Sequence, residues 1–296
     1  MESRSITLAL GGGGARGVAH LGVIEVLLDA GYTIERIVGI SIGSLAGAVY
    51  AFEPDIKRAQ QIILKYVLSP TFQHHQQVLF GVRPTADDQT TGGVFSWYNR
   101  IMDYLRANRH FHRVATRPAL LPGIILQDVV NNLLPDADIA DANIPLSIVA
   151  VDLRSGHNVI LEKGPVRDAV RASSSLPGIW PPVKFDDMLL CDIGVFYSLP
   201  TTLARSYSPR CLVAIDISTE LKRLPHCDTA MDVLMRMDEI GEALFRKHVI
   251  EEADLVIHPD LSSIEWFDFS SPEDALQAGR EAARKTLPQL NTTFAY

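Results

Sequence analysis

A chain of 296 residues, 47% of them apolar and 21% charged, can bury the core of one large α/β domain. Its formal net charge of −8 argues against binding to nucleic acid, which needs clustered Lys and Arg, and against simple attraction to anionic lipid surfaces. No run of about 18 apolar residues and no secretory signal pattern occurs, so we expect a cytoplasmic chain with reduced cysteines at Cys191, Cys211 and Cys227.

The first predicted strand, Ser5–Leu10, runs into four consecutive glycines before a helix that extends to about residue 30. Successive glycines let several backbone N–H groups converge at a helix start, an arrangement that binds an oxyanion or a phosphate. Gly12, Gly14 and Gly17 also satisfy the G-x-G-x-x-G dinucleotide fingerprint. That fingerprint needs an acidic residue at the end of the second strand, which here ends in a serine, so nucleotide binding is kept only as an alternative.

The second strand, predicted at about 36–40, leads into a Gly-x-Ser-x-Gly pattern and a helix over 42–51. Gly39 and Gly43 let the backbone bend sharply, so that the hydroxyl of Ser41 projects from the turn at a helix N-terminus. This geometry is typical of a nucleophile, although a plain turn before a Ser-capped helix has the same pattern. The alternation of strands and helices predicts a parallel sheet covered on both faces.

The middle of the chain has a different pattern, which we interpret as a helical insertion or lid at about 55–140 within a single domain spanning 1–296. Its helices are predicted at about 55–67, 94–107 and 126–134. The stretch 73–93 is rich in Gln, His, Asp and Thr and predicts a long surface loop. The adjacent His74 and His75 lack partners at metal-ligand spacing, so no metal site is expected.

Sheet patterning resumes in the last half of the chain. The strands are predicted at about 145–151, 157–161, 188–190, 211–217 and 255–258. The helices are predicted at about 166–173, 200–206, 230–252 and 272–285. We find no internal repeat and no low-complexity tract.

A serine nucleophile needs a base, and Asp192 is the preferred candidate because it directly follows an apolar run, with Gly194 permitting a tight turn. A buried carboxylate with a raised pKa can take the serine proton directly. An α/β-hydrolase would instead use a later histidine. The formal candidates for that role are His226, His248 and His258. In that fold several strands precede the nucleophile, whereas here only one comes before the strand that carries the serine.

Four segments resemble those of patatin-like phospholipases, the serine lipid acyl hydrolases that use a Ser–Asp dyad. The matching motifs lie at 12–17, 39–43, 151–156 and 171–182, and the resemblance covers about 5–52 and 145–217. It implies a three-layer α/β/α architecture with a mostly parallel central sheet and a mechanism without metal, calcium or another cofactor.

The resemblance also implies roles for individual residues. Asp192 removes the proton of Ser41, which attacks an ester carbonyl. An oxyanion loop holds the charge that develops, and its members here are Gly12, Gly13, Gly14 and Arg16. The substrate is then a phospholipid, a lysophospholipid or another acyl ester. Head group, chain length, regiochemistry and oligomeric state do not follow from the sequence.

One departure from the family pattern concerns the turn after the aspartate. The family usually has Asp-Gly-Gly or Asp-Gly-Ala, whereas this chain has Ile193 after Asp192. Because a β-branched residue adopts positive φ only at a cost, we expect a changed path or aim of the carboxylate if the turn needs glycine. The alternative function is therefore a weakly active or inactive regulatory protein that binds acyl lipids. Apolar side chains at Phe72 and 78–80 are candidates for transient peripheral contact with the inner face of a membrane.

Overall fold

A computed structural model describes residues 4–80, 119, 121–194, 196–221, 223–224, 227–228 and 230–294. An eight-stranded sheet runs through these residues. Its strands are β1 (Ser5–Leu10), β2 (Thr33–Ile40), β3 (Leu146–Asp152), β4 (Asn158–Leu161), β5 (Val183–Phe185), β6 (Met188–Cys191), β7 (Leu212–Ile215) and β8 (Leu255–Ile257). The order is β5-β6-β3-β2-β1-β7-β8, with β4 paired to β3. The pairs of β1, β2, β3, β7 and β8 along this order are parallel, while β4, β5 and β6 pair antiparallel.

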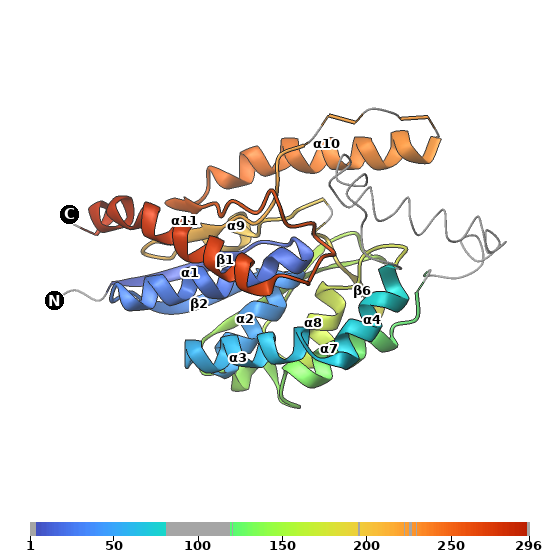
Figure 1. The fold of residues 1–296 in the computed structure, drawn as a ribbon, viewed down its shortest axis with the longest axis horizontal. Coiled ribbons are helices and arrows are strands. Elements are labelled where there is room, and N and C mark those ends of the chain that lie inside the picture. Colours follow the sequence, from blue (N-terminus) through green and yellow to red (C-terminus); the bar gives the residue numbers. More distant parts are fainter. Residues whose placement is uncertain are drawn as a thin grey trace.

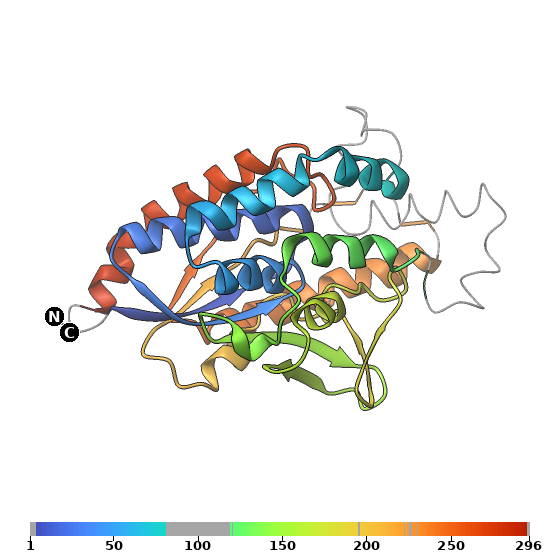
Figure 2. The same ribbon diagram turned by 90° about the horizontal axis from the view of Figure 1, so that it is seen from below.

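The helices between the strands cover both faces of the sheet. They are α1 (Val18–Asp29), α2 (Ile42–Phe52), α3 (Ile56–Val67), α4 (Pro70–Phe80), α7 (Ile124–Leu133), α8 (Val166–Ser173), α9 (Thr201–Arg205), α10 (Ala230–Ile250) and α11 (Pro272–Thr293). Figure 2 shows α1, α3 and α11 side by side on one side of the strands. Figure 1 shows α10 at the opposite edge of the molecule from α3 and α7.

Side chains that alternate along each central strand explain why both faces are covered. On β1, Leu8 and Leu10 belong to a large apolar core that also contains residues of α1, α2, α3, α8 and α11. Ala9, between them, belongs to a smaller core under α9 and the last turns of α10. A parallel strand buried on both faces is apolar throughout, as this one is. The predicted α/β/α architecture is therefore confirmed.

The structure differs from the predicted elements at α4, at the end of α11 and at β5, which was not predicted. The stretch expected to be a loop from residue 73 begins as helix α4, because Pro70 suits a first helical turn and Ser69 Oγ accepts a hydrogen bond from the Phe72 amide. The last helix continues past Pro288 to Thr293 and keeps Leu290 buried. Strand β5 has only three residues, too few for an alternating pattern to be recognised.

Two further predictions, the rest of the loop at 81–93 and the helix at 94–107, lie outside the described residues. In the parts of the chain that the structure describes, no helix is both long enough and apolar enough to cross a membrane.

Candidate active site

The turn between β2 and α2 places Ser41 in a backbone conformation that residues with a Cβ rarely adopt, with φ 52° and ψ −127°. Such positive φ values cost about 1–3 kcal/mol and persist only where the surroundings enforce them. Here the neighbouring backbone packs closely around the turn. A Cβ on Gly43 would lie 2.3 Å from the Leu10 carbonyl oxygen, and a Cβ on Gly39 would lie 2.7 Å from the Gly43 carbonyl oxygen. Only glycine therefore fits on either side of the strained serine.

The buried hydroxyl group of Ser173 fixes the position of the Ser41 turn. The Ser41 amide donates a 2.9 Å hydrogen bond to Ser173 Oγ, and that hydroxyl donates a 2.6 Å bond to the Val149 carbonyl on β3. Ser173 is completely buried at the end of α8. This role could not be predicted from the sequence, because a serine at a helix end gives no local sign of the distant amide that it contacts.

The four consecutive glycines at 11–14, called the glycine loop below, lie against Ser41. A Cβ on Gly12 would be only 3.3 Å from Ser41 Cβ. The Gly12 amide donates a 2.8 Å bond to the Ser198 carbonyl. The next anchored amide is that of Ala15, which donates to the Trp266 carbonyl at 2.6 Å. Within the described residues, no hydrogen-bond acceptor takes the N–H groups of Gly13 or Gly14. These two amides remain available to an anion, whereas the Gly12 amide, which we expected to contribute, already has a partner.

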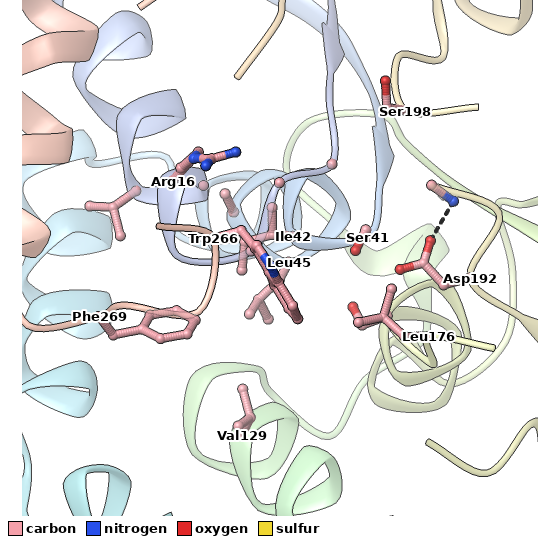
Figure 3. Close-up of a pocket in the computed structure, with 18 of the residues that line it drawn as sticks. Arg16, Ser41, Ile42, Leu45, Val129, Leu176, Asp192, Ser198, Trp266 and Phe269 are labelled. Carbon is pink, nitrogen blue, oxygen red and sulfur yellow. Dashed lines mark hydrogen bonds between the residues drawn. The ribbon is translucent and has the colours of Figure 1, made fainter. Parts of the chain in front are cut away.

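Arg16 was expected to belong to the same loop, and its position favours a structural role. Its guanidinium is buried and Nε donates a 2.7 Å hydrogen bond to the Ile264 carbonyl. Burial lowers the pKa of Arg16, and the charge of Glu265 opposes that shift. Figure 3 shows Arg16 farther along the pocket than Ser41 and Asp192. The side chain thus fastens the start of the helical turn to the segment before α11.

Asp192 follows β6 and brings its carboxyl group beside Ser41 (Figure 3). It is 1% exposed, its amide donates to the Ser175 carbonyl at 2.9 Å, and its Oδ1 accepts a 2.6 Å hydrogen bond from the Gly194 amide. Oδ2 accepts no hydrogen bond of normal length and angle from the described residues. Burial raises the pKa of Asp192 to about 7, although interaction with the Ser41 hydroxyl and the bond from Gly194 both lower it.

The isoleucine that departs from the family pattern does not strain this turn. Among the described non-glycine residues, positive φ occurs at Ser41, Asp186 and Ser208, so Ile193 has an ordinary backbone conformation. Its side chain packs against the core under α9. The turn therefore has no need of glycine at this position, so the condition under which we expected a changed aim of Asp192 is not met.

A pocket of about 310 Å³ opens onto Ser41, Asp192 and the glycine loop. One side of it is apolar and comes from α2, α3, α4, α7 and the segment before α11. The side chains there include Leu45, Ile63, Tyr66, Phe72, Leu126, Val129, Leu133, Trp266 and Phe269. Helices from the predicted insertion at 55–140 thus form much of the pocket wall.

The opposite wall of the pocket is polar and belongs to α10. Asp238, Glu239 and Glu242 line it, and the Ser198 hydroxyl donates a hydrogen bond to Glu242. Burial raises the pKa of both Asp238 and Glu242. The Ser198 carbonyl also accepts a hydrogen bond from the Gly12 amide. Ser198 therefore links this wall of the pocket to the glycine loop through hydrogen bonds.

An ion pair below that wall joins α10 to the sheet. Arg246 Nη1 lies 2.9 Å from Oδ2 of Asp216, and His258 Nδ1 lies 3.4 Å from the same oxygen. Burial alone would raise the pKa of Asp216, but the bond from His258 and the charge of Arg246 lower it to about 2. His258 therefore pairs with Asp216 rather than with Ser41.

Histidine does not take the position of a base beside Ser41 in the described part of the chain. His248 is exposed on α10, and neither it nor His258 lines the pocket. His226 lies outside the described residues. His75 lines the pocket from α4, where its ring is 3.7 Å from the Asp128 carboxylate. No group of three or more His, Cys, Asp or Glu residues that could hold a metal ion occurs in the described ranges.

A further histidine beneath the glycine loop was missed by the sequence analysis. His20, on α1, is completely buried and its Nε2 lies 2.9 Å from the Gly11 carbonyl oxygen. Burial lowers the pKa of His20 to about 4, so the ring is neutral at pH 7 and Nε2–H donates to that carbonyl. The position of His20 near the start of a mostly apolar helix, directly after the glycines, could have indicated a role beneath the loop.

The chain is similar in sequence to a known protein family and to curated proteins. A family model described as patatin-like phospholipase matches residues 8–205. Patatin-like phospholipase domain-containing protein 6 of Homo sapiens is 31% identical over 222 residues, which cover 74% of this chain and 14% of that protein. An NTE family protein of Mycobacterium tuberculosis is 26% identical over 313 residues, 97% of this chain and 47% of that protein. The chain thus spans less than half the length of these two relatives.

Among solved structures, VipD from Legionella pneumophila matches with a TM-score of 0.49 at 14% identity, over 99% of this chain and 67% of that chain. The range matched by the family model includes the glycine loop, the Ser41 turn and Asp192. On the strength of that match, which covers most of the sequence, the chain belongs to the patatin-like phospholipase family.

Proposed function

We propose that this protein is a serine hydrolase of lipid acyl esters, of phospholipase A or lysophospholipase type. Ser41 is the nucleophile, Asp192 is the base, and the amides of Gly13 and Gly14 stabilise the oxyanion. The observation that carries the proposal is a serine on a strained turn beside a buried carboxyl group whose pKa is raised to about 7. A base with a pKa near the working pH is best suited to accept and return a proton.

In the acylation step, Asp192 Oδ2 accepts the proton of Ser41 while Oγ forms a bond to the ester carbonyl carbon. The carbonyl oxygen becomes an oxyanion and accepts hydrogen bonds from the free amides of the loop. When the bond to the alcohol breaks, the proton on Asp192 passes to the leaving oxygen. The products of this step are an acyl-Ser41 ester and a free alcohol.

Deacylation reverses these roles with water. Asp192 takes a proton from a water molecule, whose oxygen attacks the acyl carbon and again forms an oxyanion. Collapse of this intermediate releases the fatty acid, and the proton returns to Ser41 Oγ. No metal ion or cofactor enters either step.

The apolar side of the pocket favours an acyl chain as the group next to the reacting carbonyl. Residues of α3, α4 and α7 contribute aliphatic and aromatic side chains there, as binding sites for apolar ligands usually do. A nucleotide would leave this wall without complementary contacts. We therefore place an ester of a long-chain acid, rather than a phosphate ester of a nucleoside, in the pocket.

The proposal is tested with a fluorophosphonate probe, a short-chain p-nitrophenyl ester and a lipid panel read by mass spectrometry. Ser41→Ala should lose probe labelling and turnover, and Asp192→Asn should lose turnover by at least about 100-fold, because the serine proton then has no acceptor. Ser155→Ala and Asp187→Asn are matched controls, since both residues are exposed near the β3–β4 and β5–β6 turns. Both controls should keep wild-type rates.

Two results would contradict the proposal. Wild-type protein that binds acyl lipids but neither takes up the probe nor releases product is the regulatory binder of the alternative interpretation. Retention on a nucleotide resin that survives Ser41→Ala, without esterase activity, would assign the glycine loop to a nucleotide.

A further inference from the structure

Helix α10 exposes several large apolar residues on the outside of the molecule, although Val249 and Ile250 at its end pack into the smaller core. Five large apolar side chains are 47–66% exposed, at spacings that place them on one helix face. This α10 stripe consists of Val233, Leu234, Met237, Leu244 and Phe245. Gly241 lies among them in open space, with no atom within 4 Å of the position that a Cβ would occupy.

Several charged residues of the same helix face the interior, whereas Lys247 and His248 are exposed. Asp238, Glu239 and Glu242 line the pocket, and Arg246 pairs with buried Asp216. A helix on the surface of a globular protein normally has the reverse arrangement, with its apolar side towards the core. Since ion pairs and hydrogen bonds already attach α10 to the body, its exposed stripe is not required for that attachment.

The α10 stripe and the pocket share one helix. The helix that bears the stripe also forms the acidic wall of the pocket. Leu221 lines the pocket too and is itself 41% exposed, so one apolar side chain of the pocket lining also reaches the solvent. Figure 1 shows α10 at the outer edge of the molecule.

We propose that the α10 stripe docks onto the surface of a zwitterionic lipid bilayer, from which the substrate enters the pocket. The inference rests on the proposed function, because a lipid ester must be taken from such a surface. Amphipathic helices of about 20–30 residues lie in the interfacial plane with their apolar side in the acyl boundary, and α10 has 21 residues. A net charge of −8 and the acidic pocket wall disfavour an anionic bilayer.

A second copy of the chain suits the stripe less well. Stable protein interfaces use about 20–30 residues on each side, whereas the stripe offers five side chains on one helix. Phe72, a candidate for membrane contact in the sequence, is buried instead, because its ring is 8% exposed and packs against Tyr66 and Phe269. The side chains at 78–80 lie outside the described part of the structure.

The test compares wild-type protein with the triple variant Leu234→Gln, Met237→Gln, Leu244→Gln, since glutamine retains helix propensity. The matched control is Ile124→Gln with Leu153→Gln, two residues that are 68% and 52% exposed on other elements. Binding is measured by flotation with phosphatidylcholine vesicles. Turnover is measured both on lipid within the vesicles and on a water-soluble short-chain ester, and thermal unfolding checks that each variant is folded.

We expect the triple variant to lose vesicle binding and vesicle-lipid hydrolysis by about tenfold or more, since burying one such side chain alone changes a partition constant by about that factor. Its rate on the soluble ester and the behaviour of the control should stay at the wild-type level. Equal vesicle binding by a folded triple variant would overturn the inference. So would a dimer of wild-type protein that the triple variant dissociates, since the stripe would then bind a second copy.

Failure of the proposed function gives a different result. Ser41→Ala protein should bind vesicles as well as wild type does, because the serine lies outside the stripe. Vesicle binding that depends on the stripe, with no hydrolysis of any ester, would support the docking surface and contradict the enzyme.

Discussion

At the residue scale, Asp192 combines burial with incomplete hydrogen bonding. Only Oδ1 has a regular hydrogen bond, from the Gly194 amide, so the charge of the carboxylate is poorly compensated in the folded protein. A buried charge without full compensation raises the pKa and costs stability. The same property that suits a base therefore destabilises the native state at neutral pH.

The sign of this effect predicts how stability depends on pH. The pKa of Asp192 is about 7 in the folded protein and near its ordinary value of 3.8 in the unfolded chain. Its protonated form favours the folded state, and this contribution is full below pH 3.8 and is lost as the pH rises through about 7. Asparagine at position 192 has no charge to bury, and its side-chain oxygen can still accept the bond from the Gly194 amide.

We therefore expect Asp192→Asn to be more stable than wild type at pH 8, by on the order of 3 kcal/mol, and to lose most of this advantage at pH 4. Urea unfolding at the two pH values measures the difference. Asp187→Asn, on the exposed hairpin turn, should show no such dependence. A constant difference between wild type and Asp192→Asn across this range would contradict a raised pKa.

At the element scale, the glycine loop is fixed by partners from several distant parts of the chain. Its Gly11 amide donates to Ile215 on β7, its Gly11 carbonyl accepts from His20 on α1, and its Gly12 amide donates to the Ser198 carbonyl before α9. These contacts leave free the two amides proposed for the oxyanion. We infer that His20 is a positioning residue, which acts on the reaction only through the loop.

This role predicts different results for two substitutions of His20. His20→Ala leaves the Gly11 carbonyl without its donor, and a displacement of the loop by about 1 Å can lower kcat by about 100-fold. The effect on KM should be small, because the acyl chain contacts other walls. His20→Gln can supply an amide N–H to the same carbonyl and should restore much of kcat.

Steady-state kinetics with the short-chain ester measures this split, with unfolding temperatures recorded for each variant. A merely structural role for His20 would lower stability in both variants without a selective loss of kcat. Glutamine that fails to rescue a stably folded protein would also contradict the positioning role.

Local sequence patterns sufficed for most of the elements, although not for α4 or β5, and they did not give all contacts between the elements. The apolar strands, the glycine loop and the turn at Ser41 follow from glycine spacing and hydrophobic runs, which act within a few residues. Ser173 bonds to the distant Ser41 amide, and the Gly12 amide bonds to the distant Ser198 carbonyl. These hydrogen bonds could not be predicted from the residues near either position. The burial of Asp192 likewise arises only when β6 joins the sheet.

At the scale of the whole molecule, residues beyond the family match support the site. The match ends at residue 205, yet the carbonyls of Ile264 and Trp266 hold Arg16 and the Ala15 amide. After these residues the chain enters α11, which packs along α1 (Figure 2). Since α1 begins where the glycine loop ends, α11 determines where the loop lies relative to the sheet.

The contact between α1 and α11 requires glycine on both helices. A Cβ on Gly22 would lie 2.0 Å from the Leu276 carbonyl oxygen, and one on Gly279 would lie 2.1 Å from the Ala19 carbonyl oxygen. Both distances are well below van der Waals contact with backbone atoms that cannot rotate away. The two helices must therefore separate if either glycine acquires a side chain.

Alanine at two helical glycines should consequently have opposite effects on stability. Gly241→Ala, in open space on α10, removes backbone entropy from the unfolded chain and should raise the free energy of unfolding by about 0.5–1 kcal/mol. Gly279→Ala gains the same entropy term but forces α11 away from α1, and overpacking of this kind costs about 1–3 kcal/mol. Urea unfolding measures both, and ester turnover should fall only for Gly279→Ala, because only that substitution disturbs the packing of α1, the helix that follows the glycine loop. If the two variants were equally stable and equally active, the position of the loop could not depend on the packing of the C-terminal helix.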